Sequence, residues 1–67
     1  MSANQVFPKL DTVSDCFSAL VQAKARLVEG AALQNNEMLD RWHSIKRELE
    51  ERILDLQMDE LFNPKDN

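Results

Sequence analysis

Cysteine, histidine, glycine and proline are scarce in this sequence, and each shortage excludes a class of structure. Cys16 is the only cysteine among 67 residues, so no disulfide can form within one chain. His43 is the only histidine, which leaves too few ligands for a structural zinc site. One glycine and two prolines are too few for the many turns of a sheet protein. We therefore expect an all-α chain without a covalent or metal staple, in a reducing compartment such as the cytoplasm.

Long apolar runs and an excess of positive charge are also missing. No run approaches the roughly 20 apolar residues that span a bilayer, and MSANQVFPKL lacks the basic and apolar regions of a signal peptide. The net charge is −4, and the acidic excess lies from Glu37 onward. Because negative charge repels phosphate and anionic lipid, we expect neither nucleic acid nor a membrane as a partner.

Two long helices account for most of the sequence. Thr12 and Asp15 have the spacing of a capping box, which starts a helix. Gly30 is the candidate C-terminal cap of that helix, and Asn35 or Asn36 the candidate N-terminal cap of the next. The predicted division is a flexible tail over 1–10, a helix over 11–29, a turn over 30–36, a helix over 37–62 and a flexible tail over 63–67.

One continuous helix is the alternative to this antiparallel hairpin. Apolar positions from Leu27 to Leu56 follow an 11-residue period, which suits a nearly straight helix in a coiled-coil-like bundle. A glycine inside a helix costs only about 1 kcal/mol, so Gly30 alone does not exclude it. We favour the hairpin because a glycine and two asparagines fall within seven positions.

The predicted helix 37–62 carries more apolar side chains than one partner helix can cover. A first row runs along it from Met38 to Leu56, and a second row contains Leu39, Leu54, Met58, Leu61 and Phe62. Soluble monomers rarely expose wide apolar patches, so we expect the hairpin to associate into a helical bundle. The predicted protein-binding residues are Trp42, Ile45, Leu49, Ile53, Leu56, Leu61 and Phe62.

Residues with catalytic chemistry form no complete constellation in the sequence. Asp40 and His43 have a spacing that could share a metal on one helix, but no second pair completes the site. Cys16 lies on an apolar stripe near acidic residues, where a thiol is unreactive. We therefore expect no enzyme, no metal or other cofactor and no small-molecule substrate.

The sequence thus predicts a small protein-interaction module. It would act as an adaptor, assembly subunit or chaperone-like partner that binds another helical protein, or itself, through an apolar helix face. One alternative is an acidic inhibitor or antitoxin that masks a basic surface of its target. Another is a purely structural homo-oligomer, whose unfolding midpoint would rise with protein concentration.

Overall fold

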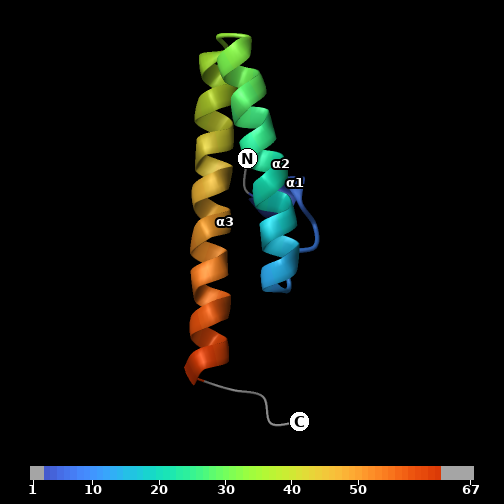
Figure 1. Ribbon diagram of the computed structural model, residues 1–67, viewed down its shortest axis with the longest axis vertical. Helices are drawn as coiled ribbons and strands as arrows, with labels where there is room; N and C mark the ends of the chain where they lie inside the picture. The colour runs from blue at the N-terminus through green and yellow to red at the C-terminus, as the bar shows by residue number, and fades with distance from the viewer. Residues whose placement is uncertain (1–2, 63–67) are drawn as a thin grey trace.

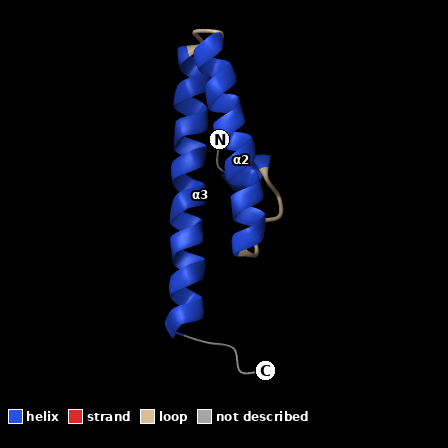
Figure 2. Cartoon of the chain, in the orientation of Figure 1, coloured by secondary structure: helices blue, strands red, loops and turns tan. Residues whose placement is uncertain are grey.

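Two long helices packed side by side dominate the computed structural model, which describes residues 3–62 (Figure 1). The helices are α1 (Ala3–Val6), α2 (Val13–Ala32) and α3 (Asn36–Phe62). A tight turn joins α2 to α3, and the two run antiparallel (Figures 1 and 2). The prediction of an all-α helical hairpin is confirmed, and the continuous helix is wrong.

The start of α2 shows the predicted capping box. The Thr12 hydroxyl accepts a hydrogen bond from the Asp15 backbone N–H at 3.1 Å, and the Asp15 carboxylate accepts one from the Thr12 N–H at 3.3 Å. These bonds satisfy N–H groups that have no partner inside the helix. They fix the first helical residue as Val13, two positions after the predicted start.

The turn between α2 and α3 covers residues 33–35 and is shorter at both ends than the predicted 30–36. Gly30 is not a cap: it lies buried inside α2, which continues to Ala32. Gln34 takes the left-handed conformation instead, with a φ of 52°. The Asn35 side chain then accepts a hydrogen bond from the Met38 N–H at 3.1 Å, as predicted for the cap of the second helix.

Gly30 is buried because the two helices approach each other closely near the turn. A Cβ atom at this position would lie 3.2 Å from Cδ2 of Leu39 on α3. The glycine therefore allows the two helices to pack closely. In the sequence alone, a glycine with this role looks the same as a glycine that caps a helix.

Residues 3–10, which we call the arm, are folded against the hairpin, where the sequence predicts a flexible tail. Ala3 and Leu10 are buried. The Ala3 N–H donates to the carboxylate of Glu48, and the Arg52 Nε–H donates to the Leu10 carbonyl at 3.4 Å. The remaining predicted tail residues, 1–2 and 63–67, lie outside the described residues.

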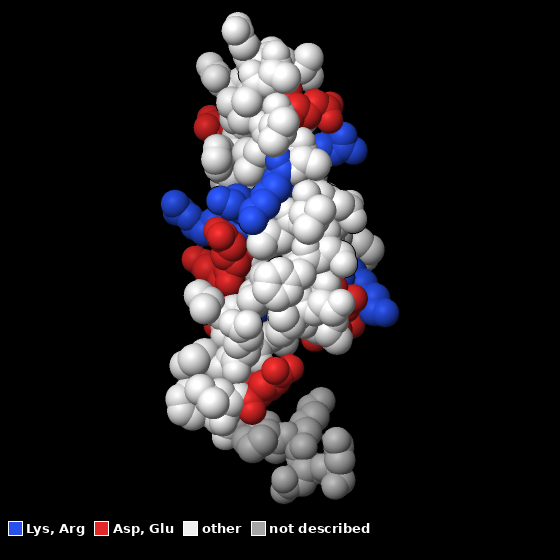
Figure 3. Space-filling view, in the orientation of Figure 1, with Lys and Arg blue, Asp and Glu red and all other residues white. Residues whose placement is uncertain are grey.

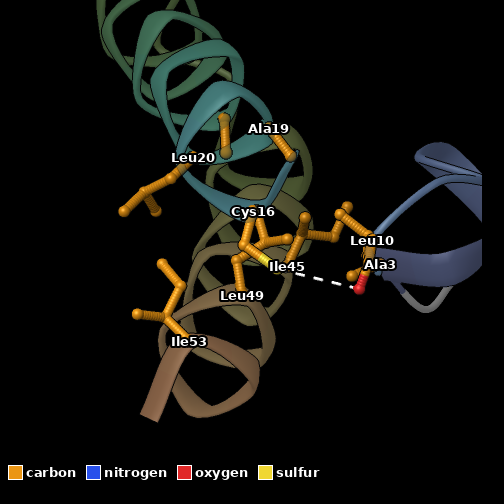
Figure 4. Close-up of a cluster of buried hydrophobic side chains, with 9 residues drawn as sticks. Ala3, Leu10, Cys16, Ala19, Leu20, Ile45, Leu49 and Ile53 are labelled. Atoms are coloured by element: carbon orange, nitrogen blue, oxygen red, sulfur yellow. Dashed lines mark hydrogen bonds between the residues drawn. The ribbon is translucent and has the colours of Figure 1, made fainter. Parts of the chain in front are cut away.

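The core lies where α2, α3 and the arm meet (Figure 4). On α2 its members are small, apart from Leu20, whereas α3 contributes large aliphatic side chains. This combination lets the two helices lie close together while their side chains interdigitate. The buried hydrophobic residues are Ala3, Leu10, Cys16, Ala19, Leu20, Ala23, Ile45, Leu49 and Ile53.

Candidate functional site

Three of the predicted protein-binding residues belong to the core of this chain. Ile45 and Leu49 are fully buried, and Ile53 is nearly so. Their side chains point toward α2 and the arm (Figure 4). The chain itself covers this face of α3, so these three residues serve the core in this structure, and their role in binding a partner stays a prediction.

Trp42 and Leu56 occupy an intermediate position at the edges of this core. Both are partly buried and pack against it. The Trp42 ring meets the ring of Phe7 from the arm edge to face, with centroids 6.2 Å apart and planes at 63°. Such a contact stabilises by about 0.5–1.5 kcal/mol beyond the area it buries. Trp42 thus helps to hold the arm in place. Much of the apolar surface of Trp42 is buried by contacts within the chain.

The last two predicted residues are exposed and belong to a row that continues to the end of α3. Leu61 is 72 % exposed and Phe62 69 %. Leu54, 60 % exposed, and Met58, 50 % exposed, precede them at spacings of four and three. We call these four residues the outer stripe. Leu54 and Met58 were missing from the predicted binding set, although their helical spacing to Leu61 and Phe62 was the signal that could have included them.

The outer stripe lies on the side of α3 that faces away from α2. Met58 follows the buried Leu49 by nine positions, which is about two and a half turns of an α-helix and therefore the opposite face. Leu54 and Leu61 follow Leu49 by five and twelve positions and lie on the same outward side. Because the outer stripe faces away from α2, even a longer α2 would leave it exposed. Only a third helix or another protein could cover it.

The surroundings of the outer stripe are acidic. Residues 50–62 contain five acidic side chains and one basic side chain, Arg52. Arg52 donates to the arm at the core edge of α3, away from the stripe. On the face drawn in Figure 3, the lower end of α3 shows uncharged and acidic surface, whereas basic side chains gather higher up. An apolar strip with a negative border is the result.

A second exposed apolar row lies on α2. Phe17, Val21 and Val28 share one flank of this helix, and we call them the α2 row. Lys24 falls between Val21 and Val28 on the same flank, so the row is interrupted by a positive charge. The α2 row is therefore less continuous than the outer stripe.

Asp40 and His43 are the candidate pair of metal ligands. Asp40 and His43 line one open depression together with Ser44, Arg47 and Glu48. Within residues 3–62 no three His, Cys, Asp or Glu side chains are grouped to hold a metal ion.

Cys16 is buried beneath the arm. Its Sγ lies 4.0 Å from the Leu10 carbonyl oxygen (Figure 4). Burial raises the pKa of the Cys16 thiol, the Arg52 guanidinium opposes this, and the Asp15 carboxylate adds to it. The thiol therefore stays protonated and weakly nucleophilic near neutral pH.

Neither long helix, over the part of the chain that the structure describes, has a stretch apolar enough to cross a bilayer. Comparison with protein-family models, characterised proteins and solved structures finds no match for this chain.

Proposed function

We propose that this chain is a protein-interaction module that binds a helical partner through the outer stripe of α3. In this role it serves as an adaptor, an assembly subunit or a chaperone-like partner. The observation that carries the proposal is the exposure of Leu54, Met58, Leu61 and Phe62 on the outward face of α3. Their spacing is the i, i+4, i+7, i+8 pattern by which helices pack against helices.

What distinguishes the outer stripe from ordinary exposed apolar side chains is that its members are aligned. Scattered leucines on a surface need no explanation. Four large apolar side chains within nine residues on one side of a helix form a contiguous patch, and such patches mark interaction sites. The first row of α3, in contrast, is used by the core.

Paired substitutions of matched exposure test this proposal. Leu61→Ser removes an apolar side chain from the outer stripe, and Val28→Ser removes one of nearly the same exposure, 71 % against 72 %, from the α2 row. Partners captured from native lysate on the immobilised chain are purified and titrated back by calorimetry. We expect Leu61→Ser to weaken the reconstituted complex about tenfold and Val28→Ser to leave it unchanged.

The proposal fails if the affinities of Leu61→Ser and Met58→Ser both equal that of the unmodified chain. It also fails if Val28→Ser is the variant that loses binding, since the α2 row would then be the interface. Far-UV circular dichroism of each variant shows that the hairpin is retained.

A further inference from the structure

We infer that the outer stripe binds a basic amphipathic helix, one whose apolar face is bordered by lysine or arginine. This inference rests on the proposed function and specifies the partner of the same site. It depends on the positions of three carboxylates relative to the stripe.

Glu50, Glu51 and Asp55 lie directly beside the outer stripe. Residues three and four apart are neighbours on a helix surface. Glu50 therefore borders Leu54 from four positions before it, Glu51 lies three before it, and Asp55 lies three before Met58. All three carboxylates belong to exposed residues. A partner helix laid on the stripe would bring its own border within a few ångströms of these groups.

The chain itself supplies little positive charge to this border. Within residues 3–62 the salt bridge formed joins Arg26 and Glu29 on α2, so Glu50, Glu51 and Asp55 have no salt-bridge partner there. Arg47 is the nearest basic residue on the outward side and lies three and four positions before Glu50 and Glu51, but within residues 3–62 it forms no salt bridge with either. The negative charge beside the stripe is thus available to a partner.

A second copy of this chain fits the outer stripe poorly for the same reason. In a symmetric dimer the same patch meets itself. The acidic border of one copy would then face the acidic border of the other, and facing like charges are destabilising. A helix with lysine or arginine beside its apolar face converts this repulsion into attraction and speeds the encounter of the two proteins.

The length of the outer stripe suits one helix as occupant. From Leu54 to Phe62 it extends about 12 Å, or slightly more than two helical turns. That length accommodates anchors of the i, i+3, i+4, i+7 kind on a partner helix. Because α2 and the arm lie on the other side of α3, neither of them obstructs the approach.

Two synthetic peptides test the inference on the full chain. One is an amphipathic helix of leucine and lysine, and the other has glutamate in place of each lysine. We expect the lysine peptide to bind in fluorescence anisotropy at low salt and the glutamate peptide not to bind. Leu61→Ser should weaken the lysine peptide about tenfold, with Val28→Ser as the matched control.

Charge reversal separates the acidic border from the apolar contact. The double variant Glu51→Lys/Asp55→Lys should weaken the lysine peptide about tenfold or more at low salt, because each attraction becomes a repulsion. The same variant should begin to bind the glutamate peptide. Added salt should weaken the lysine peptide on the unmodified chain and have a smaller effect on the double variant.

Each remaining outcome overturns the inference in a recognisable way. If both peptides bind equally and lose affinity in Leu61→Ser, the charge preference is absent but the proposed function stands. If the unmodified chain self-associates at low salt through Leu61, the occupant is a second copy. If neither peptide binds, or if Leu61→Ser binds the lysine peptide normally, the outer stripe is not a docking site for such helices and the inference is wrong.

Discussion

At the scale of the residue, Gly30 fits two different interpretations of the sequence: a cap that ends the first helix, or a small residue inside the helix where the two helices pack closely. A glycine and two asparagines within seven positions indicate a turn in which the glycine caps the first helix, and such a cap uses the left-handed conformation that glycine enters without strain. In the structure Gln34 adopts that conformation, and Gly30 lies within α2 against Leu39. The two roles predict opposite effects of adding a methyl group.

Replacement of Gly30 by alanine is therefore informative. We expect Gly30→Ala to stabilise the chain by about 0.5 kcal/mol, measured by urea unfolding. Alanine is favoured over glycine in a helix by about 1 kcal/mol, and part of this gain is lost because the partly buried Leu39 must shift by a few tenths of an ångström.

Ala25→Gly is the matched control, because Ala25 is exposed on the same helix and reports the helix preference alone. It should destabilise by about 1 kcal/mol. Destabilisation by Gly30→Ala would contradict the expected gain, and the variant Leu39→Ala then separates the two causes: if the loss disappears in that background, Leu39 cannot move, and if it persists, Gly30 is left-handed.

At the scale of the element, the arm is the part of the structure that stabilises a hairpin with a small core. It contributes two buried residues, Ala3 and Leu10, and covers both Trp42 and Cys16. Its attachment depends on separate contacts along its length: Phe7 meets Trp42, whereas Leu10 lies over Cys16. These contacts can be weakened one at a time.

Substitutions at the two arm contacts should have distinct effects. We expect Leu10→Ala to speed labelling of Cys16 by a thiol reagent about tenfold or more, because loss of a buried leucine favours opening of the arm and exposes a thiol that ionises more readily. Phe7→Ala should instead shift the fluorescence emission of Trp42 to longer wavelength, with a smaller effect on labelling. Equal labelling rates in Leu10→Ala and the unmodified chain would show that the arm does not protect Cys16.

The elements could be predicted where the determining signals are local. Thr12 with Asp15, and Asn35 at the turn, act on N–H groups within three residues, so the sequence reveals them directly. The arm could not be predicted this way, because its position depends on Glu48 and Arg52, more than forty residues away. Periodicity identified both apolar rows of α3, but the division between core and surface depends on which side α2 and the arm occupy.

At the scale of the whole molecule, the chain has a core of its own. Sequence reasoning assigned the face with Ile45, Leu49 and Ile53 to association, but that face is covered internally. A chain of this size remains a marginally stable unit, since small domains bury a modest fraction of their surface. Association is therefore expected to involve the outer stripe rather than to create the core.

The dependence of unfolding on protein concentration distinguishes a chain that folds as a monomer from one that folds only on association. We expect thermal unfolding at low salt to have a midpoint that does not change with protein concentration, because a monomer unfolds in a unimolecular process. Circular dichroism of serial dilutions, with sedimentation of the same samples, provides the measurement. A midpoint that rises with concentration would favour the structural homo-oligomer instead.

The arm also makes the two margins of the seam between α2 and α3 unequal. Phe7 to Lys9 lie near Asp15, Ser18 and Gln22 of α2, while Ala3 and Leu10 lie near Glu48 and Arg52 of α3, so the arm occupies one margin. A bare pair of helices could be gripped from either margin. Here one margin carries the arm and the other is bare helix, so the two long sides of the hairpin present different surfaces.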